Sequence, residues 1–117
     1  MVKLSRGDVV WVRLDPVEGS EQAGKRPAVV VSPDIISEHS PVVIVAALTT
    51  RKTDRVYPFE VLVSPPEGGL SRESKVLLLQ IRAIDRRRVL GRLGALSEET
   101  MSKLDEALKV AVGLKEV

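Results

Sequence analysis

The chain has 117 residues, of which 44% are hydrophobic and none is cysteine, and its formal net charge is only +2. This size fits one domain with a real core over residues 1–117. The lack of cysteine excludes disulfides and thiolate metal sites. The mild charge does not by itself require a nucleic-acid partner. Because no apolar run reaches the roughly 18 residues of a transmembrane helix and the N-terminus has no apolar signal segment, we expect a cytoplasmic protein.

The first half of the chain reads as three strands. Residues 8–14 partly alternate between apolar and polar and predict the first strand. The polar stretch from Gly19 to Pro27 is predicted to be a loop. The short apolar run at residues 28–32 fits a strand covered on both faces. A loop or short helical turn at residues 35–40 leads to the strongest strand pattern, at residues 42–48.

Three more strands are predicted further on, at residues 57–63, 75–84 and 89–96, the last one weakened by Gly91 and Gly94. Polar or proline-rich segments separate them. Five or six short antiparallel strands favour a small twisted sheet or a partly open barrel. Such a small sheet leaves edges and an apolar face, which pairing of two copies as a homodimer would cover.

The C-terminal segment changes to helical spacing. Ser97 is a favourable N-cap residue, and two glutamates follow it in the first turn. Apolar residues then recur at positions 101, 104, 108, 111 and 112, which predicts one amphipathic helix packed on the sheet. Asp105 and Lys109 are spaced to form an i,i+4 pair on its outer face.

The loop between the first two strands is unusually rich in functional groups. Turn residues normally fill such a connection, but this one holds a hydroxyl, a carboxylate, a carboxamide and two cations, on Ser20, Glu21, Gln22, Lys25 and Arg26. Functional groups on a loop that a rigid scaffold positions are a common way to build an active site.

A second candidate group lies at the end of the strand at residues 42–48, where Thr49 and Thr50 follow it. If that strand neighbours the one at residues 28–32, its end lies near Arg26, whose extended conformation is favoured by the proline after it. A guanidinium has a fork of donors that matches a phosphate. The alternative is that Arg26 is a surface cation and Thr49 caps its own backbone.

Other kinds of site find little support. The one histidine, His39, has no second histidine or cysteine with which to share a metal, and we expect it to be exposed in a loop. The motifs of phosphate-binding loops, dinucleotide sites and serine hydrolases are missing. The carboxylates of Asp8, Asp15, Glu18 and Glu21 could ligate a hard metal ion, although turn formation or simple exposure is the more common role.

Cations gather in two segments, residues 51–55 and 82–92, and form patches that could hold phosphates or an acidic partner. Solvated basic faces are the more common explanation. Trp11, Tyr57 and Phe59 are the only aromatic residues, so a binding mode dominated by base stacking is not expected.

Several segments, taken together and in order, resemble the MazF/PemK toxins of toxin–antitoxin systems. The first is Arg6 to Val12, continued by Leu14 to Pro16 and by the loop Gly19 to Pro27. The others are Ile44 to Thr49, Gln80 to Asp85 and the helix from Leu96 to Leu108. The resemblance covers essentially the whole chain. It implies a mainly β fold, a small SH3-like barrel of five to six antiparallel strands with a C-terminal helix, that forms homodimers.

The resemblance also implies a sequence-specific endoribonuclease that cuts single-stranded mRNA without a metal or other cofactor. A cognate antitoxin, through a disordered acidic and apolar C-terminal segment, would block the RNA groove. Arg26 corresponds to the catalytic arginine of the family and Thr49 to its catalytic threonine, and Glu21 is our candidate for the general base. The expected RNA contacts come from the same loop and from two further strands: Ser20, Gln22, Lys25, Thr50, Arg51, Gln80 and Arg82.

Such an enzyme uses the 2′-hydroxyl of the RNA as its nucleophile, and the expected products are a 2′,3′-cyclic phosphate and a 5′-hydroxyl end. Two alternatives share the fold. One is a toxin of the CcdB type, which acts on DNA gyrase and cuts nothing. The other is a catalytically inactive RNA-binding regulator. The intact loop and Thr49 favour the nuclease.

Overall fold

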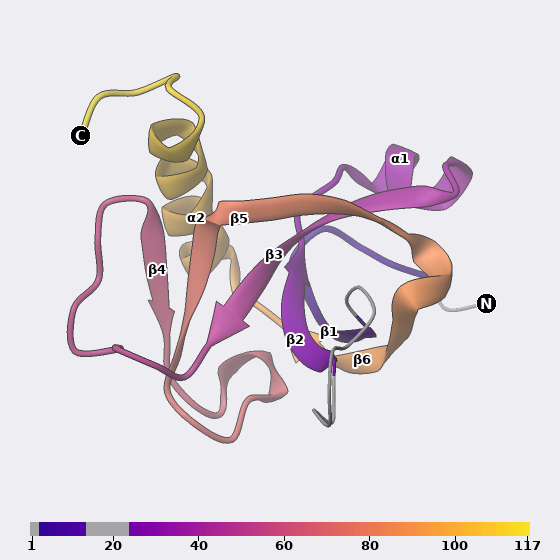
Figure 1. Cartoon of the computed structure of the whole chain (residues 1–117), viewed down its shortest axis with the longest axis horizontal. Coiled ribbons are helices and arrows are strands. Elements are labelled where there is room, and N and C mark those ends of the chain that lie inside the picture. Colours follow the sequence, from indigo (N-terminus) through magenta and orange to yellow (C-terminus); the bar gives the residue numbers. More distant parts are fainter. Residues whose placement is uncertain (1–2, 14–23) are drawn as a thin grey trace.

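The computed structural model of the chain describes residues 3–13 and 24–117. Its six strands form one antiparallel sheet in the order β4-β5-β3-β2-β1-β6, so the predicted mainly β fold with a C-terminal helix is confirmed (Figure 1). The strands are β1 (Asp8–Arg13), β2 (Lys25–Val30), β3 (Val42–Thr49), β4 (Glu60–Val63), β5 (Ser74–Asp85) and β6 (Val89–Ala95). The helices are α1 (Asp34–His39), α2 (Glu98–Ala111) and the short 3₁₀ turns η1 (Glu67–Gly69) and η2 (Arg86–Arg88).

The paired middle of β2 and β3 is apolar because both faces of the sheet are covered there. Val29 and Ala46 belong to one core, which lies between the sheet and α2. Their neighbours Ala28 and Val45 belong to a second core, enclosed where the sheet curls so that β1, β2 and β6 lie away from α2 (Figure 1). Successive side chains of a strand point to opposite faces, so β2 and β3 each supply both cores in alternation. The prediction that the run at residues 28–32 is covered on both faces is confirmed.

Helix α2 forms as its sequence predicts. The Ser97 hydroxyl accepts a hydrogen bond from the Thr100 backbone N–H at 3.1 Å and caps the helix. Leu104 and Ala107 are buried against the sheet, while Val112, predicted on the apolar face, lies beyond the helix end and is half exposed.

The predicted i,i+4 pair on α2 does not form. Asp105 instead pairs with Arg6, from the segment before β1, at 2.8 Å. Lys109 pairs with Glu106 at 3.1 Å. A cation from another part of the chain thus replaces the local partner of Asp105 and ties the N-terminal segment to α2.

Part of the predicted loop Gly19 to Pro27 belongs to a strand. Strand β2 begins at Lys25, and Trp11 of β1 pairs with Pro27 while Val12 pairs with Arg26. Proline is tolerated here because Pro27 is paired with β1 but not with β3, since pairing with β3 begins only at Ala28. The N–H that proline lacks therefore removes no hydrogen bond to β3. Residues 14–23 lie outside the described residues.

Strand β4 is shorter than predicted, because a turn replaces its first residues. The Glu60 N–H donates to the Tyr57 carbonyl at 2.9 Å, and the Glu60 side chain accepts from the Tyr57 N–H at 3.1 Å. Pro58 follows Tyr57 in this turn, at the position where its fixed φ is favourable.

The predicted helical turn near residues 35–40 is confirmed as α1. Its last residue is His39, which is exposed as expected but is helical rather than in a loop.

Within residues 3–13 and 24–117, neither helix has the length and apolar character that crossing a membrane requires.

Candidate active site

The pairing of β2 with β3 places two of the three predicted catalytic residues, Arg26 and Thr49, at one end of the sheet. Ala28 of β2 is the register partner of Ala47 of β3. Arg26 and Thr49 lie two residues beyond this pair, on their own strands and in the same direction. Because side chains alternate between faces with a period of two, both are on the face that carries Ala28 and Ala47. The predicted adjacency of the two strands is confirmed.

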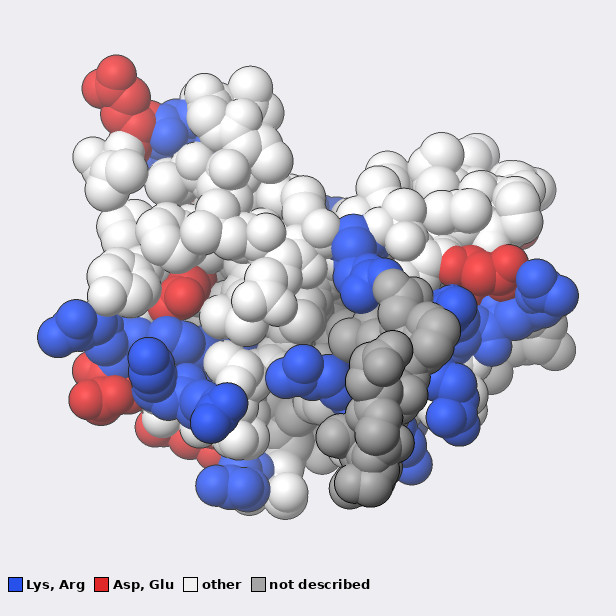
Figure 2. Space-filling view, viewed as in Figure 1, with Lys and Arg blue, Asp and Glu red and all other residues white. Residues whose placement is uncertain are grey.

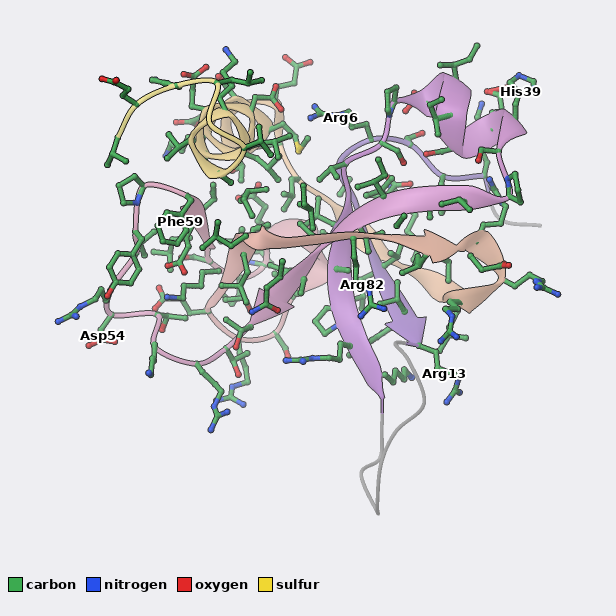
Figure 3. The ribbon with its side chains drawn as sticks, turned by 45° about the horizontal axis from the view of Figure 1, so that its top comes forward. Arg6, Arg13, His39, Asp54, Phe59 and Arg82 are labelled. Carbon is green, nitrogen blue, oxygen red and sulfur yellow. The ribbon has the colours of Figure 1, made fainter. Side chains whose placement is uncertain are left out.

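A pocket of about 350 Å³ opens on that face. Its lining comes from four strands and consists of Val12, Pro27, Ala28, Val45, Ala47, Gln80, Ile81 and Arg82. It therefore contains two of the predicted RNA-contacting residues, Gln80 and Arg82, together with the proline that follows Arg26. In Figure 3 the labelled Arg82 lies over β2 in the middle of the molecule. Residues that are far apart in the sequence thus meet around one concavity.

The Thr49 hydroxyl is already fixed by its own chain. Its Oγ1 accepts a hydrogen bond from the Arg51 backbone N–H at 3.1 Å. A hydroxyl has one hydrogen to donate and two lone pairs, so this bond leaves the hydroxyl hydrogen for an acceptor outside the protein. The capping role considered as an alternative for Thr49 is therefore real, and it is compatible with donation to a phosphate oxygen.

Cations surround this end of the sheet. Arg26 and Lys25 are both exposed, and the Lys25 ammonium lies 4.8 Å from the centre of the Trp11 ring, an arrangement that holds a flexible side chain in place. Thr50 and Arg51 are exposed directly after Thr49. Figure 2 shows Lys and Arg side chains across the lower part of this face of the molecule. The surface thus favours a polyanion.

Three predicted site residues, Ser20, Glu21 and Gln22, lie outside the described residues, and so do the carboxylates of Asp15 and Glu18. Asp8, the remaining one of the four carboxylates considered for a metal, is buried. It accepts from the Ser5 N–H at 2.9 Å and pairs with Arg92 at 3.2 Å. Among residues 3–13 and 24–117, no three His, Cys, Asp or Glu side chains cluster in a way that could hold a metal ion.

The second basic segment has structural partners. Arg87 makes two hydrogen bonds of 3.0 Å to the Asp85 carboxylate, which hold the pKa of Asp85 down at about 2. Arg86 donates to the Ser37 carbonyl, and Arg88 donates to the Arg13 carbonyl at 3.2 Å. These arginines therefore help to join β5, β6, α1 and β1.

The sequence alone gave no indication of a buried ion pair beside Thr49. Lys75 is the register partner of Thr49 on β5, and its ammonium lies 2.8 Å from the Glu60 carboxylate, with both side chains less than 10% exposed. A lysine at the start of the apolar run Val76 to Leu79 resembles an ordinary strand-end cation. The sequence shows only that Lys75 lies next to a predicted strand, and this position does not reveal that its side chain is buried.

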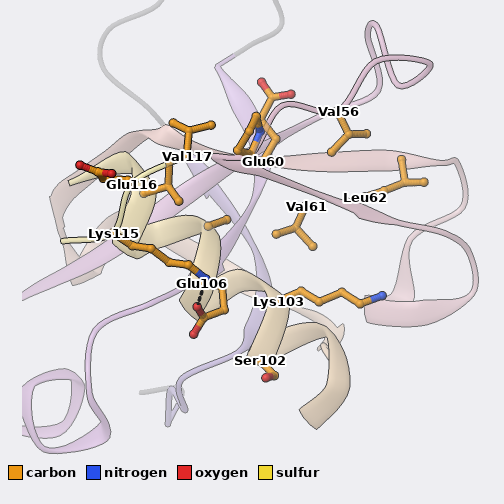
Figure 4. Close-up of a pocket in the computed structure, with 13 residues that line it drawn as sticks. Val56, Glu60, Val61, Leu62, Ser102, Lys103, Glu106, Lys115, Glu116 and Val117 are labelled. Atoms are coloured by element: carbon orange, nitrogen blue, oxygen red, sulfur yellow. Dashed lines mark hydrogen bonds and ion pairs between the residues drawn. The ribbon is translucent and has the colours of Figure 1, made fainter. Parts of the chain in front are cut away.

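A second pocket, of about 690 Å³, lies between β4, α2 and the C-terminal residues (Figure 4). It contains none of the predicted site residues. Among the residues that line it, Lys115 and Glu106 form an ion pair at 2.5 Å, drawn as a dashed line in Figure 4. Of these two pockets, only the smaller one is therefore lined by predicted site residues, Gln80 and Arg82.

Comparison with known proteins identifies the family. Residues 5–112 match the family of "PemK-like, MazF-like toxin of type II toxin-antitoxin system". The endoribonuclease EndoA of Bacillus subtilis is 41% identical over 111 residues, which cover 95% of this chain and 96% of that protein.

Solved structures of similar proteins support the same family assignment. A MazE–MazF complex from Deinococcus radiodurans matches with a TM-score of 0.80 and 28% identity, covering 98% of this chain and all of that one. A mycobacterial endoribonuclease in complex with its cognate antitoxin matches with a TM-score of 0.77 and 25% identity, covering 97% and 99% of the two chains. Its sequence and its fold therefore agree, and this chain belongs to the PemK-like, MazF-like toxin family of type II toxin–antitoxin systems.

Proposed function

We propose that this protein is an endoribonuclease toxin that cuts single-stranded mRNA at specific sequences without a metal ion. The observation that carries the proposal is the position of Arg26 and Thr49, two residues beyond the register pair Ala28–Ala47 and on its face. Gln80 and Arg82 line the pocket on the same face. The relative EndoA, 41% identical over nearly the whole chain, is an endoribonuclease by name.

RNA brings its own nucleophile to this site. The 2′-oxygen bonds to phosphorus while the bond from phosphorus to the 5′-oxygen breaks, which leaves a 2′,3′-cyclic phosphate and a 5′-hydroxyl. A base takes the proton of the 2′-hydroxyl, and the departing 5′-oxygen gains one. The protein therefore has to orient the phosphate, stabilise its added negative charge and assist two proton transfers.

Each described residue has a role that suits its chemistry. The Arg26 guanidinium stabilises charge on the phosphate oxygens through its fork of N–H donors. Because a guanidinium is a permanent cation, electrostatic stabilisation suits it better than proton donation. Thr49 donates its hydroxyl hydrogen to a phosphate oxygen or to the 2′-oxygen. Glu21 is our candidate for the base.

The remaining predicted residues bind the strand on either side of the cut. Lys25, Thr50, Arg51, Gln80 and Arg82 are our candidates among the described residues, and Ser20 and Gln22 complete the set. Sequencing the 5′ ends of fragments from a mixed RNA pool would give the recognised bases directly.

The test of the proposed function is cleavage of a long single-stranded RNA in the presence of EDTA. We expect discrete fragments from the wild-type protein and none from Arg26→Ala, with partial activity in Arg26→Lys, which keeps the charge but loses the planar fork. A correctly folded Arg26→Ala protein that still cuts would contradict the assignment, and RNA retained without fragments would indicate a binding regulator.

A second substrate tests the nucleophile. An RNA with a single 2′-deoxy nucleotide at the cut site should remain intact, because its attacking oxygen is missing. Cleavage of this RNA would mean that water is the nucleophile. Loss of cleavage of the normal RNA in EDTA would instead reveal a metal requirement.

The proposal also includes two partners and a compartment. As in the MazE–MazF complex of Deinococcus radiodurans, we propose a cognate antitoxin, here with a disordered acidic and apolar C-terminal segment that covers the RNA site. Arg82 on the pocket wall suits an acidic segment, and the binding should weaken as salt rises. We also propose that the active form is a cytoplasmic homodimer.

A further inference from the structure

A buried lysine–glutamate pair lies beside the candidate catalytic hydroxyl. Lys75 of β5 is the register partner of Thr49 on β3 and of Leu62 on β4. Its side chain is 5% exposed and that of Glu60 is 9% exposed, with 2.8 Å between the ammonium and the carboxylate. Residues directly opposite each other on antiparallel strands project from the same face, so Lys75 and Thr49 are neighbours there.

Packing alone does not explain an ion pair at this position. Moving two charges out of water is unfavourable, and their mutual attraction often does no more than compensate for it. For this reason, apolar residues of similar volume often replace a buried pair without loss of stability. An apolar side chain at position 75 would, however, lack the hydrogen bonds that the ammonium donates. The function of Lys75 is therefore to be found in those bonds.

The hydrogen bonds of the pair hold the connection between β3 and β4, residues 50–59. The Lys75 ammonium donates to the Arg55 carbonyl at 2.8 Å as well as to Glu60. The same Glu60 oxygen accepts from the Tyr57 N–H at 3.1 Å. One buried pair thus fixes the backbone at two points, both between the labelled Asp54 and Phe59 in Figure 3.

From this attachment, further hydrogen bonds lead back to Thr49. The Arg55 N–H donates to the Lys52 carbonyl at 3.3 Å, and Lys52 has a left-handed conformation, with φ of 54°, which turns the chain. Its neighbour Arg51 donates its N–H to Thr49 Oγ1 at 3.1 Å. A short series of hydrogen bonds therefore joins the buried ammonium to the candidate catalytic hydroxyl.

The bond from the Arg51 N–H restricts where the Thr49 hydroxyl can donate. A hydroxyl has one hydrogen and two lone pairs, so a donor fixed at one lone pair limits the directions left for the hydrogen. A donor stabilises developing charge best when it is already aimed at it. A shift of about 1 Å in such a group can lower the rate by about a hundredfold. The position of the turn after Thr49 is therefore important for the proposed reaction.

We propose that Lys75, held by Glu60, is a positioning residue of the active site. It fixes the turn after β3 and, through the Arg51 N–H, orients the Thr49 hydroxyl. This inference rests on the proposed nuclease function. Because the buried pair acts through Thr49 and does not touch the RNA, its loss slows the chemical step and leaves RNA binding almost unchanged.

The first experiment separates the chemical step from binding. Single-turnover cleavage of a short RNA over a range of enzyme concentrations gives the saturating rate and the half-saturating concentration. We expect Lys75→Met to lower the saturating rate by about ten- to a hundredfold and to leave the half-saturating concentration nearly unchanged. Lys75→Arg keeps the charge and the donors and should recover most of the rate. A Lys75→Met protein that raises only the half-saturating concentration would contradict the positioning role.

Asp8→Asn is the matched control for damage to a buried ion pair. The Asp8 side chain is 6% exposed and pairs with Arg92 at 3.2 Å. Asp8 begins β1 and Thr49 ends β3, and because both strands are antiparallel to β2, these residues lie at opposite ends of the sheet. Asp8→Asn should lower the melting temperature and keep the saturating rate. If it slows cleavage as much as Lys75→Met does, lost stability is the cause and the inference is wrong.

A double-mutant cycle tests whether Lys75 acts through the hydroxyl. In Thr49→Val the hydroxyl is missing, so adding Lys75→Met should lower the residual rate much less than it does in the wild-type protein. A structural effect unrelated to the hydroxyl would lower the rate by the same factor in both backgrounds. That result would overturn the proposal.

Hydrogen exchange of the Arg51 amide, followed by NMR, gives a readout that needs no RNA. Thr49→Val removes the acceptor of this N–H and should speed its exchange. Lys75→Met should bring the exchange rate close to that of Thr49→Val, whereas Asp8→Asn should leave it at the wild-type value. An Arg51 amide that exchanges at the wild-type rate in Lys75→Met would show that the turn does not depend on the ammonium.

The outcomes separate this inference from the function on which it rests. If the wild-type protein cuts RNA and Lys75→Met cuts it at the same rate, the positioning role is wrong and the nuclease stands. If the wild-type protein cuts nothing, both proposals fail. Should Lys75→Met not fold, its combination with Glu60→Gln removes the unpaired charge, and the same expectations apply to that variant.

Discussion

At the scale of single residues, the Thr49 hydroxyl accepts one hydrogen bond from its own chain and has a hydrogen left to donate. Its Oγ1 accepts from the Arg51 N–H, so its hydroxyl hydrogen can point to a phosphate. We expect Thr49→Val, which keeps the shape of the side chain, to lower kcat by a factor of about 10²–10³, the usual effect of removing one donor to a developing oxyanion. Thr49→Ser should stay within roughly tenfold of wild type.

The measurement is single-turnover cleavage of a short RNA at saturating enzyme. If Thr49→Ser is as inactive as Thr49→Val, the methyl group rather than the hydroxyl matters, and the donor role is wrong. Equal melting temperatures for the two variants would exclude a loss of folded protein as the cause.

Asp85 gives a residue-scale prediction about acid stability. Hydrogen bonds from the Arg87 side chain and backbone lower the pKa of Asp85 from its ordinary value of 3.8 to about 2. Since the pKa is lower in the folded state, this stabilisation is complete above about pH 4 and is lost as the pH falls toward 2. Asp85→Asn should therefore show a shallower fall in its urea midpoint over that window, and so should Arg87→Gln.

The effect is expected to be small because Asp85 and Arg87 are at the surface, where solvent screens the pair. Combining Arg87→Gln with Asp85→Asn should add nothing to the Asp85→Asn variant, which has already lost the titrating carboxylate. A double variant with a clearly shallower slope than both singles would mean that the two side chains stabilise the fold independently.

At the scale of elements, β6 contains two glycines with different structural roles. A Cβ on Gly94 would lie 2.6 Å from the Gly68 carbonyl carbon and 2.8 Å from the Gly69 nitrogen, both of them backbone atoms, whereas a Cβ on Gly91 would meet nothing within 4 Å. The close approach lets η1 pack on β6. The sequence pattern, in which both glycines weaken the strand, could not distinguish them.

We expect Gly94→Ala to destabilise the protein by about 1–3 kcal/mol, the usual range for forcing extra atoms into a packed site. Gly91→Ala should be neutral or stabilise by up to about 1 kcal/mol, because it reduces the freedom of the unfolded chain. Urea unfolding gives both values. Equal destabilisation by the two substitutions would show that strand geometry, and not the contact with η1, is responsible.

At the scale of the whole molecule, the single chain leaves large apolar side chains exposed on its sheet. Ile44, Leu79 and Leu90 are 37%, 61% and 44% exposed, and such surfaces usually mark an interface. We expect a homodimer in which Ile44 is buried, so Ile44→Lys should raise the dissociation constant by on the order of a hundredfold. Leu114→Lys, in the 77%-exposed side chain near the C-terminus, should leave it unchanged.

Light scattering during size-exclusion chromatography over a range of concentrations measures this directly. An Ile44→Lys protein that remains as dimeric as wild type would place the interface elsewhere. A wild-type protein that stays monomeric at every concentration would contradict the dimer itself.

Local sequence signals were sufficient to predict the strands and the C-terminal helix, and they pointed to the residues of the candidate site. Alternation, continuous apolar runs, the Ser97 cap and the order of the motifs are local signals, because each depends on residues that lie close together in the chain. This is why six strands and one long helix were predictable, and why the loop with Arg26 was recognisable. Errors arose where local patterns are ambiguous, as at Lys25 to Pro27 and at Tyr57 to Phe59.

How these parts meet depends on the three-dimensional fold. The register of β2 on β3 put Arg26 and Thr49 at one end of a common face, and the pairing of β3 with β5 put Lys75 beside Thr49. Asp105 likewise paired with Arg6 in place of its helical neighbour. Burial and register depend on contacts between distant segments, and a single sequence contains no local signal for them.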